Sequence, residues 1–236
     1  MSGAGGPDVI KVSPSGLTFD WESCKRCYWL SARGVLKRPS GAFPRVFTVI
    51  DGLTKDFYFN VPTNEMAAGL PPGRVSVGDR WVRSRPIAVP GHETRVAIAG
   101  KIDTALAFDD GSYGVIDYKT SQPKAEHVDF YSRQLHAYAL ALEQPAEGAL
   151  ELSPISVLGL LCVEPVAMVA LEADVALKGE TTFLPIERDD EAFTAFLSQV
   201  LFVLEQPEPP DPAPKCSYCK YLAAGSIVTL TGLYGV

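Results

Sequence analysis

The sequence has no apolar run of the ~18–20 residues that a membrane-spanning helix requires, so we expect no membrane partner. The stretch from Met1 to Pro7 also lacks the charged segment and following apolar run of a secretory signal, which favours a cytoplasmic location. Positive charge is in deficit, because 21 Lys and Arg stand against 28 Asp and Glu, a formal net charge of −7. That balance excludes binding of nucleic acid through bulk charge, but not through a local basic surface. Histidine is scarce, and the spacing of His92, His127 and His136 suggests no metal site or acid–base pair.

Apolar residues are plentiful, at 47% of the 236, which is typical of a globular protein with one sizeable core. Helical and strand-like patterns alternate, so we expect a single α/β domain over residues 1–236 with a mixed sheet flanked by helices. Residues 1–12 are expected to be flexible, 62–78 to form a loop, and the proline-rich segment 206–215 to be an extended connector. The predicted helices are Leu17–Arg33, Val46–Asn60, Glu126–Glu143 and Asp189–Leu204, the last capped by Asp189. The predicted strands are Trp81–Val89, Arg95–Phe108, Tyr113–Lys119, Ile155–Val163, Val166–Ala173 and Thr181–Ile186.

Charged residues gather on the hairpin that the Asp-Gly turn at 110–111 predicts. Asp117 and Lys119 are two apart and so share one face of their strand, and the turn brings Asp103 of the neighbouring strand within reach. Carboxylates among apolar neighbours are costly unless they are neutralised, and oxygen ligands favour Mg²⁺ or Mn²⁺. Taken alone, Asp117 and Lys119 could equally be an ion pair at a strand end.

Gln134 and Tyr138 lie four residues apart on the next predicted helix and therefore share a face. The combination of G-K-I-D at 100–103, D-Y-K at 117–119 and Q-L-H-A-Y at 134–138 resembles the PD-(D/E)xK nuclease superfamily, in particular its RecB-like and Cas4-like branch. The resemblance implies a restriction-endonuclease-like fold and a metal-dependent, exonuclease-like deoxyribonuclease that acts on DNA with single-stranded or frayed ends.

By that resemblance, Asp103 and Asp117 would hold Mg²⁺ or Mn²⁺, Lys119 would position the attacking water, and Gln134 and Tyr138 would organise the substrate phosphate. The family usually adds an acidic residue or histidine from an early helix. Asp51 is the best match here, although it departs from the commoner Glu or His, and Asp56 is the fallback.

Cysteines form two C-x-x-C pairs near opposite ends of the chain, Cys24 with Cys27 and Cys216 with Cys219, whereas Cys162 lies alone in an apolar run and is expected to be a buried thiol. Without an export signal the pairs are better read as metal ligands than as disulfides. Their spacing fits zinc or an iron–sulfur cluster equally well. The resemblance implies a [4Fe–4S] cluster that joins the two ends, although the two-plus-two arrangement departs from the common one-plus-three, and zinc stays as the alternative.

A basic segment follows the first cysteine pair and contains no acidic residue up to Val49. It is either a solvated surface or a track for DNA phosphates, and its cations are Lys25, Arg26, Arg33, Lys37, Arg38 and Arg45. The alternative to a nuclease is a catalytically inactive nucleic-acid-binding or assembly module that retains the nuclease fold. A redox or zinc-sensing protein is a third interpretation.

Overall fold

The computed structural model describes residues 8–39, 41 and 43–232, with side chains as far as Gly225. Its strands are β1 (Val9–Val12), β2 (Gly73–Arg83), β3 (Ile87–Ala88), β4 (Arg95–Phe108), β5 (Tyr113–Lys119), β6 (Ile155–Ala170) and β7 (Val175–Ile186). Its helices are the π-helical turn η1 (Gly16–Asp20), α1 (Trp21–Ser23), α2 (Lys25–Ala32), α3 (Arg45–Tyr58), α4 (Thr63–Met66), α5 (Ala125–Glu143), α6 (Asp190–Leu204) and α7 (Ser217–Gly232). None of the helices in the described part of the chain is long and apolar enough to cross a membrane.

Strand β4 organises the sheet, because its 14 residues pair with β1 in parallel and with β2, β3 and β5 in antiparallel orientation. The path then continues from β5 to a parallel β6 and an antiparallel β7. Helix α5 makes the long crossover that the parallel β5–β6 pair requires. The expected mixed sheet flanked by helices is therefore confirmed.

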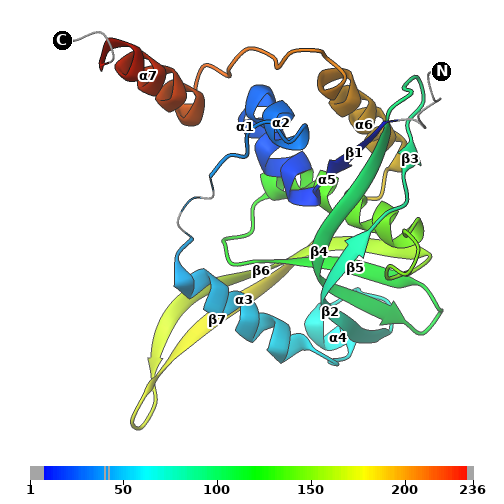
Figure 1. The fold of residues 1–236 in the computed structure, drawn as a ribbon. Coiled ribbons are helices and arrows are strands. Elements are labelled where there is room, and N and C mark those ends of the chain that lie inside the picture. The colour runs from blue at the N-terminus through cyan, green and yellow to red at the C-terminus, as the bar shows by residue number, and fades with distance from the viewer. Residues whose placement is uncertain (1–7, 40, 42, 233–236) are drawn as a thin grey trace.

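Two apolar clusters cover the two faces of the sheet. The larger joins one face to η1, α1, α2, α5 and α6, and the smaller joins the other face to α3 and α4 through Tyr58 and Met66. In Figure 1 helices α1, α2 and α6 lie above the sheet, and α3 and α4 lie below it. The distal part of the β6–β7 hairpin projects beyond the sheet, and α7 follows the long connector after α6.

Several expectations about the elements were wrong. The predicted helix Leu17–Arg33 is broken at Cys24, whose extended backbone (φ −169°, ψ 115°) separates α1 from α2. The predicted strand Val166–Ala173 is not separate, because β6 runs without interruption to Ala170 and pairs with β7 along its length. The predicted loop 62–78 contains α4 and the start of β2.

The two ends of the chain also differ from expectation. Within the segment expected to be flexible, Val9–Val12 forms β1 and pairs in parallel with Arg95–Ile98, while residues 1–7 lie outside the described residues. The segment after Cys216, for which no element was predicted, begins α7. Residues 206–215 contain no helix or strand, which agrees with an extended connector.

Candidate active site

The site forms where β4 and β5 separate. Their ladder runs from Ala107–Tyr113 to Thr104–Ile116, and the next residue of β4 is Asp103. Its Oδ2 atom accepts a hydrogen bond from the Tyr118 backbone N–H at 3.0 Å, so the carboxylate takes the place of a strand partner. This arrangement holds Asp103 against β5 at the level of Asp117, as the hairpin pattern predicted.

Asp117 is a buried carboxylate with a defined partner on each oxygen. It is 4% exposed, its Oδ2 forms an ion pair with Lys119 Nζ, and its Oδ1 accepts a hydrogen bond from Gln134 Nε2 at 3.0 Å. Burial, together with nearby Asp103, raises the pKa of Asp117 to about 7 against the opposing effect of the Lys119 ammonium. Burial would lower the pKa of Lys119, but the Asp117 carboxylate overrides that effect and raises it.

Helix α5 supplies the polar side chains above these charges. Gln134 Nε2 lies 3.4 Å from the Tyr138 hydroxyl oxygen, and that hydroxyl donates to the Lys101 carbonyl at 2.7 Å. Gly100 makes the close approach possible, since a Cβ there would lie 3.1 Å from Tyr138 Cε1 and 2.8 Å from Pro14 Cδ. The structure thus brings together Asp103, Asp117, Lys119, Gln134 and Tyr138.

A lysine that the sequence analysis missed extends the site. Lys55 Nζ lies 2.7 Å from Asp51 Oδ2, 3.0 Å from Asp79 Oδ1 and 2.9 Å from Asp103 Oδ1. Asp51 therefore reaches the site through Lys55, whereas the fallback Asp56 is exposed. The only local signal was the four-residue spacing of Asp51 and Lys55, and nothing in the sequence pointed to Asp79.

The donor set fits a hard divalent cation. Asp103 and Asp117 offer carboxylate oxygens, which Mg²⁺ and Mn²⁺ prefer. Gln134 Oε1 is buried and has no hydrogen-bond donor among the described residues, so this acceptor is free for water or substrate. Asp103 and Asp117 would hold the ion, and Gln134 would face the water or substrate that the ion binds.

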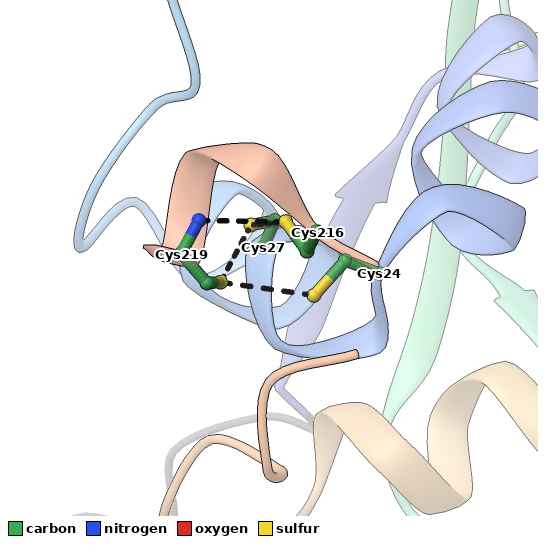
Figure 2. Close-up of side chains that lie close together, drawn as sticks. All are labelled: Cys24, Cys27, Cys216 and Cys219. Atoms are coloured by element: carbon green, nitrogen blue, oxygen red, sulfur yellow. Dashed lines mark hydrogen bonds between the residues drawn. The ribbon is translucent and has the colours of Figure 1, made fainter. Parts of the chain in front are cut away.

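The four paired cysteines form a second cluster, which Figure 2 shows where the start of α7 meets α2. The sulfur of Cys27 lies 3.4 Å from that of Cys219 and 3.7 Å from that of Cys216, and the sulfurs of Cys24 and Cys219 are 3.9 Å apart. All four sulfurs lie within 4.8 Å of one another. A tetrahedron with metal–sulfur bonds of ~2.3 Å has edges of ~3.8 Å, so the cluster matches four thiolates around one centre. Cys162 is buried and lies outside the cluster, as expected.

The basic segment is partly engaged within the protein. Lys25 Nζ donates to the Trp21 carbonyl at 2.7 Å, and Arg26 donates to the Pro210 carbonyl at 3.1 Å. Arg33 pairs with Asp8 at 3.5 Å and Arg38 donates to Ser23 Oγ at 2.8 Å. Lys37 and Arg45 are exposed.

Three comparisons with known proteins bear on the family of this chain. A sequence model of the PD-(D/E)XK nuclease superfamily matches residues 62–224, which include β4, β5 and α5. Among solved structures, one titled "Crystal structure of SSO0001" superposes with a TM-score of 0.46 at 15% identity, over 91% of this chain and 84% of that one. A search of curated proteins gave no significant match. The sequence match covers well over half of the chain and contains the β4–β5 carboxylates and the α5 glutamine, so this chain belongs to the PD-(D/E)XK nuclease superfamily.

Proposed function

We propose that this protein is a Mg²⁺- or Mn²⁺-dependent deoxyribonuclease that hydrolyses phosphodiester bonds in the exonuclease-like manner of the RecB-like and Cas4-like branch. The observation that carries the proposal is the buried Asp117, which is paired with Lys119 and hydrogen-bonded to Gln134 beside Asp103. A buried ionisable cluster of this kind is the usual mark of a catalytic site in a fold with hydrolytic relatives.

Each residue has a role that its position supports. Asp103 and Asp117 would hold the ion, which when bound would polarise a phosphate oxygen and lower the pKa of water. Lys119 stays protonated because Asp117 raises its pKa, so its ammonium can hold the attacking water and offset negative charge that develops on phosphorus. Gln134 and Tyr138 would orient the phosphate from α5. The exposed Lys37 and Arg45 would bind more distant phosphates of a DNA end that is single-stranded or frayed.

The cysteine cluster is proposed to bind one zinc ion. The resemblance implies a [4Fe–4S] cluster, in which each thiolate binds a different iron and the sulfurs lie farther apart than around one ion. Sulfur distances of 3.4–3.9 Å favour the single tetrahedral centre. Metal analysis of anaerobically purified protein decides between them, because one zinc per chain in a colourless sample supports this assignment, whereas iron with a broad band near ~400 nm supports the cluster.

The nuclease proposal is tested with Lys119→Met. Wild-type protein with Mn²⁺ should degrade end-labelled DNA, and Lys119→Met should lose at least ~100-fold in rate because the ammonium contributes mainly in the transition state. Lys178→Ala on β7 is the matched control, since Lys178 is exposed on the projecting hairpin. Circular dichroism and thermal unfolding establish that both variants fold. Full cutting by folded Lys119→Met would overturn the proposal.

One observation favours the second candidate, a binding or assembly module without catalysis. Lys55 already supplies a positive charge to Asp51, Asp79 and Asp103, so these carboxylates have a cation without a metal ion. That candidate predicts that the wild-type protein binds DNA but cuts none in Mg²⁺ or Mn²⁺, which the same assay measures.

A further inference from the structure

Trp81 is an exposed aromatic residue beside the candidate active site. Its side chain is 71% exposed, whereas the other two tryptophans, Trp21 and Trp29, are 5% and 7% exposed. Tryptophan has a large apolar ring with one polar N–H, a combination that suits it to binding surfaces. Neither the family resemblance nor the proposed chemistry assigns a role to this residue.

The register places Trp81 on the face of the sheet where Lys55 of α3 contacts Asp103, opposite the face on which α5 covers Asp117. Trp81 is the direct partner of Lys101, Val82 of Gly100 and Arg83 of Ala99. Val82 and Ile102 are buried on the opposite face. Asp103 follows Lys101 by two residues and therefore shares its face.

Ion pairs connect these positions. Asp79, two residues before Trp81, contacts Lys101 Nζ at 3.0 Å through Oδ2 and Lys55 Nζ at 3.0 Å through Oδ1. Lys55 in turn contacts Asp103. A DNA strand that is bound at Asp103 and continues along this face would reach Lys101 and then the ring of Trp81.

The surroundings of the ring are basic and hollowed. A groove of about 540 Å³ lies beside Trp81, within the ~300–1,000 Å³ range of small-ligand sites. The residues that line it are Asp79, Arg80, Trp81, Arg83, Gly148, Ala149 and Leu150. Arg80 and Arg83 are exposed there and suit phosphates, and Arg83, two residues from Trp81 on β2, shares the face of the ring.

We infer that Trp81 is a stacking platform for an unpaired base of single-stranded DNA, with Arg80 and Arg83 taking the flanking phosphates. A stacking surface beside positive charge complements a single strand, in which every base has a π-face and every phosphate linkage is negatively charged. The inference rests on the proposed function only in naming this strand as the one that reaches Asp103 and Asp117. Trp81 is thus a positioning residue, because the base that it holds is not at the bond that is cut.

The first test is binding without added divalent ions, so that no cutting occurs. Short single-stranded oligodeoxythymidylate should quench the tryptophan fluorescence of the wild-type protein, because Trp81 is the exposed one of the three tryptophans. Trp81→Ala should raise the Kd for the oligonucleotide roughly tenfold, in line with the loss of one stacked base, and Trp81→Phe should restore most of the affinity. Phe202→Ala on α6 is the control, since Phe202 is equally exposed, at 69%, and lies outside the Trp81 groove.

An abasic oligonucleotide and a cutting assay make the outcome specific. The Kd values of the wild-type and Trp81→Ala proteins should differ less for the abasic oligonucleotide, because it has no base to stack on the ring. In Mn²⁺, Trp81→Ala should raise the KM for single-stranded substrate more than it lowers kcat. Equal Kd values for folded Trp81→Ala and wild-type protein would overturn the inference. Quenching by DNA without any cutting would sustain the inference and overturn the nuclease proposal, so the two failures are distinguishable.

Discussion

Lys55 shows how a single side chain sets the electrostatics of the site. Burial would lower its pKa, but the carboxylates of Asp51, Asp103 and Asp79 override that effect and raise it well above the ordinary value. Its ammonium remains charged at neutral pH, and its side chain is 17% exposed. Three carboxylates that converge within ~3 Å of one atom repel one another unless a cation lies between them. Lys55 is therefore an internal counter-ion, and a metal ion bound by Asp103 shares that carboxylate with it.

Replacement of Lys55 by methionine tests this role. Lys55→Met should lower the free energy of unfolding in metal-free buffer by about 1–3 kcal/mol, because Asp51, Asp79 and Asp103 lose the cation that they share. Mn²⁺ should then raise the melting temperature of the variant more than that of the wild type. Urea unfolding and thermal scans with and without Mn²⁺ measure both effects. Lys101→Met is the control, since Lys101 pairs with Asp79 alone and is 44% exposed, and it should cost less than ~1 kcal/mol.

Asp117 gives the site a predictable pH dependence. Burial raises its pKa to about 7 in the metal-free protein, so a proton occupies the carboxylate more and more as the pH falls below 7. A metal ion needs the deprotonated form and must displace that proton. The affinity for Mn²⁺ should therefore be nearly constant above pH 8 and fall by up to ~10-fold per pH unit below 7.

Electron paramagnetic resonance of free Mn²⁺ measures that affinity between pH 5.5 and 8.5. An affinity that is flat across the range would mean that Asp117 is ionised throughout and that its burial does not control metal binding. Asp51→Asn serves as the comparison, since Asp51 contacts Lys55, and it should keep the slope below pH 7.

At the scale of elements, the strands that carry the site could be predicted from the sequence because their signals are local. Strands β4 and β5 have the predicted boundaries, Arg95–Phe108 and Tyr113–Lys119, and the turn between them contains Gly111 at φ +85°. Asp189 caps α6 as predicted, since its Oδ1 accepts a hydrogen bond from the Ala192 N–H at 2.8 Å. A turn or a cap depends on a few neighbouring residues, and the sequence displays those directly.

The features that escaped prediction depend on distant parts of the chain. Helical periodicity continues across Cys24, yet the backbone is extended there, where the sulfur lies 3.9 Å from that of Cys219. Asp79, Lys55 and Asp103 come from three elements, and only the folded sheet shows that one ammonium serves them all. One group of site residues could be predicted, because a hairpin and the next helix bring its members together. These are Asp103, Asp117, Lys119, Gln134 and Tyr138.

At the scale of the whole molecule, the cysteine cluster joins the start and the end of the described chain. Cys24 and Cys27 flank the first turn of α2, and Cys216 and Cys219 begin α7, after a connector without helix or strand. Hydrogen bonds also hold the connector, among them those from Arg26 to the Pro210 carbonyl and from Trp29 Nε1 to the Gln206 carbonyl at 3.2 Å. A bound metal ion would close this long loop and so stabilise the placement of α7 far more than these bonds do.

Loss of the thiolates should therefore loosen the C-terminal end before it unfolds the sheet. The double variant Cys216→Ser/Cys219→Ser should lose its bound metal and become at least ~10-fold more sensitive to trypsin after the exposed Lys215, while the core that joins α5 to the sheet keeps its far-ultraviolet circular dichroism. Cys162→Ala is the matched control: Cys162 is a fully buried cysteine outside the cluster, so this variant should keep its metal and its resistance at Lys215. Retention of metal by the double variant would show that the four sulfurs do not form the site. Equal sensitivity in wild-type and double variant would show that the connector is held by its own contacts, and that the cluster serves a purpose other than joining the two ends.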